Sequence, residues 1–223
     1  MIISPIWLVF IASLFFPSNS NSGSTDKLNV GDFSHRDLTG WTEKSFVSQT
    51  DYTLHINDTV SVLKGHANKS ASIFYKAIKI DLQKTPWMHW SWKVSNTYGD
   101  INEQKKSGDD YPARIYIVIK TGIFPWNTRA LNYVWASSSP KEKIWDNAYT
   151  KHAKMIAMQS GTQFVGQWKT ETRNIREDIR NILGREIDII DGIAIMVDAD
   201  DSQLEATGYF SDIYFTHEKN PEK

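Results

Sequence analysis

Most apolar positions along the chain alternate with polar ones, which is typical of strands that bury one face. Turn residues such as Asn57-Asp58 and Ser160-Gly161 separate these segments. A dozen short strands of this kind predict an all-β sandwich or barrel. The predicted strands cover residues 28–33, 41–47, 52–57, 59–66, 71–82, 87–95, 113–120, 130–137, 154–160, 166–173, 192–199 and 207–216.

One segment has helical periodicity instead. Ile175, Ile179, Ile182 and Leu183 fall on one face of residues 174–183, and charged residues fall on the other. Gly184 follows, in the position where helices commonly end. We therefore expect one short helix near 174–184.

Four predicted strands separate their two faces clearly. Each has one row of apolar residues, and these rows include Trp90, Ile115, Tyr133 and Ile195 respectively. Each row is expected to face the partner sheet. Trp90, Trp92 and Trp135 belong to these rows and are expected in the core. If the four strands share a sheet, its other face gathers the polar and aromatic side chains of Trp87, His89, Lys93, Arg114, Tyr116, Asn132 and Asp198.

That combination of side chains suits a polar ligand that has apolar ring faces. Sugars fit, because their C–H faces pack on aromatic rings and their hydroxyls bond to Arg, Asn and Asp side chains. Trp126, Trp145 and Trp168 lie nearer loops and are further candidates for such a platform. The alternative is that Lys93, Arg114 and Asp198 only form cross-strand pairs on a solvated sheet.

An acidic cluster follows the last core strand. Asp198-Ala199-Asp200-Asp201 spaces oxygen donors as calcium loops do, but Gln203 and Tyr209 break the EF-hand pattern. A calcium site of another type, with Asp198 and Asp200 as ligands, is one interpretation, and a solvated turn is the other. We expect no other cofactor.

Composition and charge exclude several classes of protein. The chain has 223 residues, a net charge of -1 and no cysteine. This charge gives no broad basic field, so nucleic acid is not an expected partner. Without cysteine, disulfides, thiolate zinc sites and cysteine nucleophiles are ruled out.

The N-terminal residues predict export. Residues 6–16 form an apolar run of signal-peptide length, and small polar residues follow it, with candidate cleavage sites after Ser20 and after Ser22. We expect a signal peptide over 1–22 and one β-sandwich domain over 23–223, located in the periplasm or secreted, and away from the membrane after cleavage. Because no Lys or Arg precedes the apolar run, an uncleaved anchor is the alternative.

Catalytic motifs are mostly missing. The sequence has no Gly-x-Ser-x-Gly elbow, no phosphate-binding glycine loop and no His-Glu-x-x-His. A glycosidase would need two carboxylates facing each other across a cleft. Asp110, Glu171, Asp178 and Asp198 are the candidates for such a pair.

Four ordered motifs resemble a family of bacterial proteins, the domain of unknown function 3047 family. They are Trp90–Val94, Gly108–Tyr116, Leu131–Trp135 and Gly192–Asp200. The resemblance runs from about Phe33 to Phe215. It implies an exported protein with a two-sheet, jelly-roll-like β-sandwich related to carbohydrate-binding modules, and it implies no established activity. The polar positions characteristic of the family fall on Lys93, Asp109, Asp110, Arg114, Asn132, Arg173, Asp178, Asp198 and Asp200.

Three functional hypotheses follow. The preferred one is a non-catalytic protein that binds a glycan or similar polar small molecule on one sheet face. The second is an enzyme acting on polysaccharide or cell-envelope material, with Asp198 or Asp110 as acid or base. The third is a structural protein of the envelope. For the first, the expected ligand-binding residues are Lys93, Arg114, Asn132, Asp198, Asp110, Tyr116, His89 and Trp168.

Overall fold

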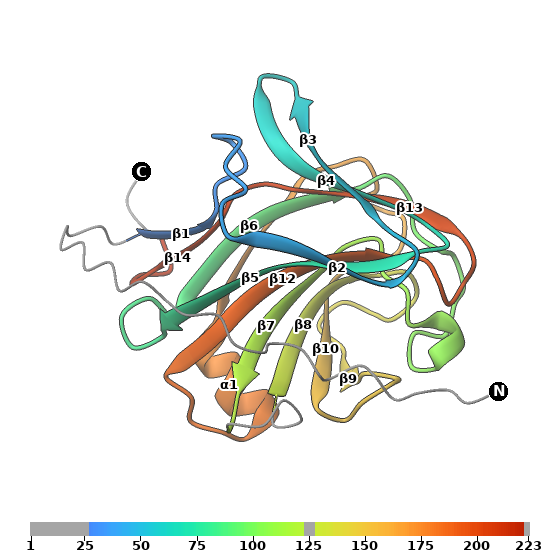
Figure 1. Ribbon diagram of the computed structural model, residues 1–223. Coiled ribbons are helices and arrows are strands. Elements are labelled where there is room, and N and C mark those ends of the chain that lie inside the picture. Colours follow the sequence, from blue (N-terminus) through green and yellow to red (C-terminus); the bar gives the residue numbers. More distant parts are fainter. Residues whose placement is uncertain (1–26, 123–127, 221–223) are drawn as a thin grey trace.

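The computed structural model describes residues 27–122 and 128–220. It consists mainly of two seven-stranded sheets that pack face to face, which confirms the expected two-sheet β-sandwich (Figure 1). The expected signal peptide and Trp126 lie outside the described residues. Within the described part of the chain, no helix has the length and apolar character needed to cross a membrane.

The first sheet, here called sheet I, has strand order β1-β14-β6-β13-β4-β3, and β11 pairs with β6. Sheet II has the order β2-β5-β12-β7-β8-β10-β9, in which β10 runs parallel to β8. The strands of sheet I are β1 (Lys27–Gly31), β3 (Asp51–Asn57), β4 (Val60–Asn68), β6 (Trp87–Val94), β11 (Lys169–Asn174), β13 (Glu205–Phe210) and β14 (Ile213–Thr216). Those of sheet II are β2 (Trp41–Val47), β5 (Ala71–Asp81), β7 (Arg114–Lys120), β8 (Thr128–Ala136), β9 (Ile144–Asp146), β10 (Ala153–Ser160) and β12 (Ile189–Asp198).

The core lies between the two sheets and is built from the predicted apolar rows. Trp90 and Trp92 of sheet I and Trp135 of sheet II are almost completely buried there. The rings of Trp92 and Trp135 meet edge to face, with centroids 6.2 Å apart. The prediction that these tryptophans belong to the core is therefore confirmed.

The C-terminal strand differs from the prediction. Residues 207–216 were expected to form one strand, but they form β13 and β14, with a break at Ser211 and Asp212. Both strands pair with β6, and the Ser211 side chain accepts a hydrogen bond from the Ser91 backbone N–H (2.8 Å). The Ser211 N–H donates to the Ser91 carbonyl (2.9 Å), so the break leaves β6 hydrogen-bonded.

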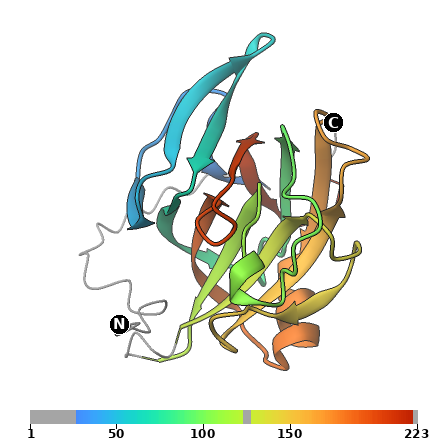
Figure 2. The ribbon, with the colours of Figure 1, turned by 90° about the vertical axis from the view of Figure 1, so that its right-hand side faces the viewer.

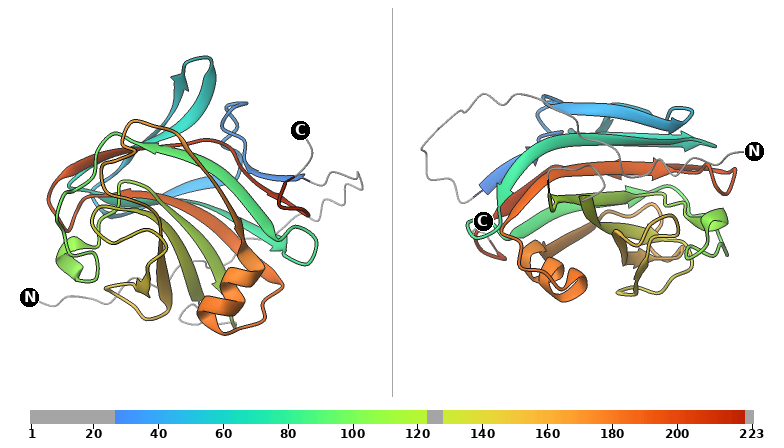
Figure 3. Two further views of the ribbon diagram at one scale, coloured as in Figure 1. Left: turned by 180° about the vertical axis from the view of Figure 1, so that it is seen from behind. Right: turned by 60° about the horizontal axis from the view of Figure 1, so that its bottom comes forward.

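Helix α1 (Ile175–Leu183) lies at the lower edge of the sandwich in Figure 1 and in the rear view of Figure 3. Asn174 caps it by accepting the Glu177 N–H, and Gly184 ends it in a left-handed conformation (φ 62°). Arg173 holds the helix through two hydrogen bonds to Asp178 of 2.6 and 2.8 Å. The predicted helix is confirmed, and a short 3₁₀ turn covers Lys106–Gly108.

The β3–β4 hairpin extends beyond the rest of the sandwich, as Figure 2 shows. Its turn contains Asp58 at a positive φ of 56°, a conformation that Asp tolerates better than most residues. The hairpin leaves β3 as the edge strand of sheet I.

Candidate functional site

The outer face of sheet II presents a row of side chains that runs across its strands. The register places Tyr75 beside Ala194, Ala194 beside Tyr116, Tyr116 beside Asn132, and Asn132 beside Met155. We call these five residues the central row. Tyr116, Asn132 and Ala194 point away from the core, because their neighbours along the chain belong to the buried rows. Tyr75 and Met155 share that face through the register.

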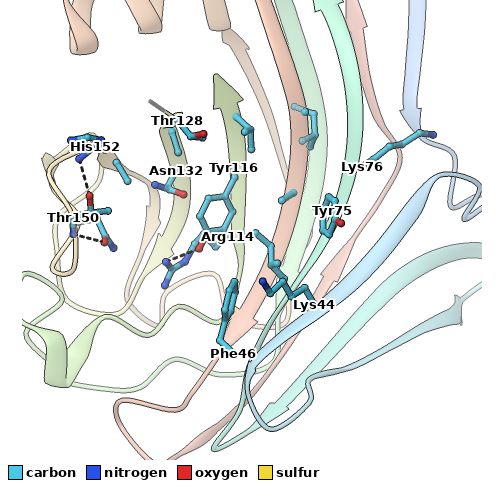
Figure 4. Close-up of a pocket in the computed structure, with 18 residues that line it drawn as sticks. Lys44, Phe46, Tyr75, Lys76, Arg114, Tyr116, Thr128, Asn132, Thr150 and His152 are labelled. Atoms are coloured by element: carbon cyan, nitrogen blue, oxygen red, sulfur yellow. Dashed lines mark hydrogen bonds between the residues drawn. The ribbon is translucent and has the colours of Figure 1, made fainter. Parts of the chain in front are cut away.

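A pocket of about 140 Å³ opens on this face. Tyr75 and Tyr116 of the central row line it from either side of β12, as Figure 4 shows. Phe46 and Lys44 of β2 contribute at one end, and the Lys44 ammonium lies 5.9 Å from the centre of the Phe46 ring. The two tyrosines stand on strands separated by β12, so their backbones are roughly 10 Å apart.

Asn132 is a buried amide in the lining of this pocket, with 1% of its surface exposed. Its Nδ2 donates to the carbonyl of Lys154 (3.2 Å). Its Oδ1 is buried and has no hydrogen-bond partner among the described residues. Such a group costs about 1–3 kcal/mol when left unpaired, so this oxygen suits a ligand that donates a hydrogen bond.

Arg114 forms the buried end of the pocket and is also 1% exposed. Its Nη2 donates to Asp198 Oδ2 (2.5 Å) and to the carbonyl of Asp109 (2.9 Å), and its Nη1 donates to the Tyr116 hydroxyl (2.9 Å). Burial raises the pKa of the Asp198 carboxyl, and the Arg114 charge opposes that rise by favouring the carboxylate. The pair fixes the Tyr116 ring through its hydroxyl.

A loop between β9 and β10 forms one wall of the pocket with Asn147, Thr150 and His152. The Asn147 side chain accepts the N–H groups of Tyr149 and Thr150, which is an Asx-type turn. Its Nδ2 donates to Asp109 Oδ2 (2.8 Å). The loop is therefore tied to the same acidic residue that lies beside Arg114.

The predicted ligand-binding residues divide between two faces. Arg114, Tyr116 and Asn132 line the pocket, and Asp198 lies directly behind Arg114. The expectation that 87–95 shares a sheet with the other three strands is wrong, because β6 belongs to sheet I. Alternation assigns the two faces of one strand, but it does not determine which strands pair.

The sheet I residues of the prediction therefore lie on the opposite side of the sandwich. The Lys93 ammonium donates to Asn57 Oδ1 (2.8 Å) and lies 5.2 Å from the centre of the Trp168 ring. The His89 ring is hydrogen-bonded to Thr172 and Thr216, on neighbouring strands. The Lys93 ammonium and the His89 ring therefore each have hydrogen-bond partners within sheet I.

The acidic residues after β12 form a separate cluster. Asp110 is fully buried, and its carboxylate accepts the N–H groups of Asp201 and Ser202. The carboxylate oxygens of Asp110, Asp200 and Asp201 lie within 4.8 Å of one another, close enough to share a cation. The predicted calcium pair of Asp198 and Asp200 is not the pair that converges, because Asp198 turns toward Arg114.

Tyr75, Lys44 and Phe46 were not predicted as site residues. In β5, Phe74 and Tyr75 are adjacent, so each face of the strand carries an aromatic ring. The sequence therefore does not indicate which face is buried. In β2, Lys44 and Phe46 alternate with Glu43 and Ser45 without a continuous apolar row. The missed signal was the pair Ile73 and Tyr75, whose spacing of two places both on one face.

Carboxylates are missing from the pocket lining. Among the described residues that form it, none is Asp or Glu. Asp198 lies behind Arg114 and is 2% exposed, and Asp110 holds a turn. The described site therefore lacks the two opposed carboxylates that hydrolysis of a glycosidic bond ordinarily uses.

The family model described as "Protein of unknown function (DUF3047)" matches residues 39–214. No curated protein matches the chain. The solved structures to which the chain is similar include the following three. A family 11 carbohydrate-binding module of Clostridium thermocellum has 11% identity and a TM-score of 0.45, covering 87% of this chain and 96% of its own.

The other two are enzyme domains. The xyloglucanase domain of NopAA from Sinorhizobium fredii has 12% identity and a TM-score of 0.46, covering 81% of this chain and 95% of its own. A cellulase derived from Cel12A of Rhodothermus marinus has 12% identity and a TM-score of 0.44, covering 83% of this chain and 97% of its own.

Proposed function

Because the chain belongs to the DUF3047 family, whose name records no activity, we propose from its site alone that it is an exported, non-catalytic protein that binds a glycan. The ligand lies on the outer face of sheet II, in the pocket between Tyr75 and Tyr116. The export part of the proposal is supported by the apolar run over residues 6–16 and the small polar residues after it.

The observation that carries the proposal is the composition of the central row. Two half-buried tyrosine rings flank Ala194, whose small side chain leaves space between them, and the Asn132 amide lies next to Tyr116. A pyranose ring presents C–H groups on its faces and hydroxyls around its edge. The tyrosines supply apolar surface for the faces, and the unpaired Asn132 Oδ1 supplies an acceptor for a hydroxyl or N–H.

The non-catalytic part is supported by the chemistry of the lining. The described pocket residues include no carboxylate, and the nearby Asp198 is paired with Arg114 at 2.5 Å. A general acid must reach the glycosidic oxygen. Asp198 could do so only if Arg114 left its place, so the geometry favours binding over hydrolysis.

The test is a glycan array followed by calorimetry with the best ligand, using the wild-type protein and Tyr75→Ala. Tyr75 has a half-buried ring on the pocket side, so its loss removes one ring face that the sugar would contact. We expect affinity to fall about tenfold, as loss of an aromatic contact of about 1.5 kcal/mol would cause.

Tyr214→Ala is the matched control, because Tyr214 is a half-buried tyrosine of sheet I. It should leave affinity unchanged. Failure of the wild-type protein to bind any glycan on the array would overturn the proposal. Equal losses in the two variants would overturn the assignment of the ligand to sheet II.

A further inference from the structure

We propose that the pocket recognises the acetamido group of an N-acetylated sugar. This inference rests on the proposed function and names the ligand class of the same site. It arises from two buried polar atoms in the lining and from the small apolar residues beside them.

The two atoms make opposite demands on a ligand. Asn132 Oδ1 is an acceptor and Arg114 Nε is a donor, and both are buried without a partner among the described residues. Both residues are only 1% exposed and line the pocket. A ligand that satisfies both must donate to Asn132 and accept from Arg114. The remaining polar contacts of each side chain go to the protein, which fixes both in place.

The register sets how far apart these demands lie. Tyr116 is directly opposite Asn132, and Arg114 precedes Tyr116 by two residues on the same face. Arg114 and Asn132 are therefore diagonal neighbours, with side chains that start about 7 Å apart. The N–H and the C=O of an acetamido group lie in one plane and point in opposite directions, so the group can reach both partners. One hydroxyl would have to approach both with a single oxygen atom.

A second row of small side chains accounts for the methyl of the acetamido group. Beside the central row, the register aligns Gly192, Val118, Ala130 and Ala153 across β12, β7, β8 and β10. All four line the pocket. Ala130 precedes Asn132 by two residues, so it lies on the same face and next to the amide. This row offers an apolar surface with room for a methyl group beside the Asn132 acceptor.

At the Arg114 end of the pocket, charge also favours a neutral group. The Arg114 guanidinium is already paired with the Asp198 carboxylate, with 2.5 Å between Nη2 and Oδ2. The Nε–H therefore offers a directed hydrogen bond inside a locally compensated ion pair, and a carbonyl oxygen is a suitable acceptor. An acetamido carbonyl meets this demand without bringing a further charge into the pocket.

The test compares three β-1,4-linked hexasaccharides by calorimetry on the full mature protein. They are the hexamers of N-acetylglucosamine, of glucosamine and of glucose, which differ at carbon 2. We expect the N-acetylated hexamer to bind at least about tenfold more tightly than the other two, because it alone makes both hydrogen bonds and buries the methyl.

Ala130→Leu tests the position of the methyl. The larger side chain fills the space beside Asn132, so affinity for the N-acetylated hexamer should fall about tenfold or more, and by a larger factor than affinity for the glucose hexamer. Thr53→Leu on exposed β3 is the control for adding the same side chain to the other sheet. Unfolding midpoints establish that each variant is folded.

The outcomes separate the two proposals. If the glucose and N-acetylated hexamers bind equally, or if Ala130→Leu weakens both alike, the acetamido assignment is overturned while glycan binding stands. If none of the three hexamers binds but the array identifies a glycan without an N-acetyl group, the acetamido assignment is again wrong. If no glycan binds at all, the proposed function itself fails.

Discussion

Arg114 carries a buried charge that a few neighbouring groups compensate. Its guanidinium donates to Asp198 at 2.5 Å, and both side chains are almost inaccessible to water. Removing one member of such a pair leaves the other as an uncompensated buried charge. Asp198 also accepts the Tyr111 N–H, so the pair connects β12 to the segment that precedes β7.

We predict that Asp198→Ala lowers the free energy of unfolding by about 3–5 kcal/mol, measured by urea denaturation. The matched control is Asp146→Ala, because Asp146 forms a 2.6 Å pair with Lys154 whose side chains are 49% and 30% exposed. The control should cost less than about 1 kcal/mol. The double variant Arg114→Met/Asp198→Leu should cost less than Asp198→Ala. Equal costs for Asp198→Ala and Asp146→Ala would contradict the buried-pair interpretation.

Residue types alone could predict part of the site. Arg114, Tyr116 and Asn132 were predicted because each alternates with a clear apolar row and so lies on the other face, and all three line the pocket. Tyr75 was not predicted, because Phe74 and Tyr75 are both aromatic and either could have faced the core. The unpaired atoms of Asn132 and Arg114 could not be predicted at all, since they depend on which neighbours occupy the other polar atoms.

At the scale of elements, the turn after β12 gathers more acidic groups than it can easily ionise. Burial, followed by the neighbouring carboxylates, raises the pKa of Asp200 to about 6. Burial is also the largest cause for Asp201, whose pKa is raised to about 6 although its carboxylate accepts the Tyr149 hydroxyl. Asp110 holds this turn through two backbone N–H groups. The turn is therefore sensitive to the protonation of its own carboxylates.

This arrangement predicts a loss of stability as the pH rises. The folded pKa of about 6 lies above the ordinary value of 3.8, so the folded protein holds protons that the unfolded chain has released. The free energy of unfolding should fall between about pH 4 and pH 6, and the protonation-linked stabilisation should be absent above that range. Asp200→Asn should flatten the decline, in urea denaturation series run with a chelator present.

Asp146→Asn, at an exposed carboxylate of β9, is the control and should keep the wild-type slope. Identical slopes for wild type and Asp200→Asn would show that this turn does not set the pH dependence.

The elements themselves follow closely from alternation and capping, but their pairing does not. The predicted helix begins after Asn174 and ends at Gly184 because those two residues have local capping roles. The predicted strand 207–216 is interrupted because Ser211 bonds to Ser91, a contact made with a strand that is 120 positions away in the chain. Strand 87–94 has the same alternation as its neighbours in the prediction, yet it lies in the other sheet. Such long-range pairing leaves no local sign.

At the scale of the whole molecule, the sandwich has two outer faces of different character. The face of sheet II holds the pocket, in which Asn132 and Arg114 retain unpaired polar atoms among the described residues. On the face of sheet I, the Lys93 ammonium is bonded to Asn57 and lies 4.7 Å from the centre of the Tyr209 ring. Both faces carry aromatic rings and cations, so composition alone does not distinguish them. The polar contacts do, because the Lys93 ammonium has a partner within sheet I, whereas Asn132 Oδ1 and Arg114 Nε have none among the described residues.

The last prediction therefore compares the two faces directly. The double variant Lys93→Ala/Trp168→Ala removes the cation and a ring that lies 5.2 Å from it on sheet I. It should keep the affinity for the array-selected glycan within about twofold, measured by calorimetry, while Tyr75→Ala loses about tenfold. The core and both sheet backbones separate the two faces, with sheets about 10 Å apart, so a ligand seated between Tyr75 and Tyr116 cannot touch Lys93. A loss in the double variant as large as that of Tyr75→Ala would place sheet I in contact with the ligand and contradict the one-face assignment.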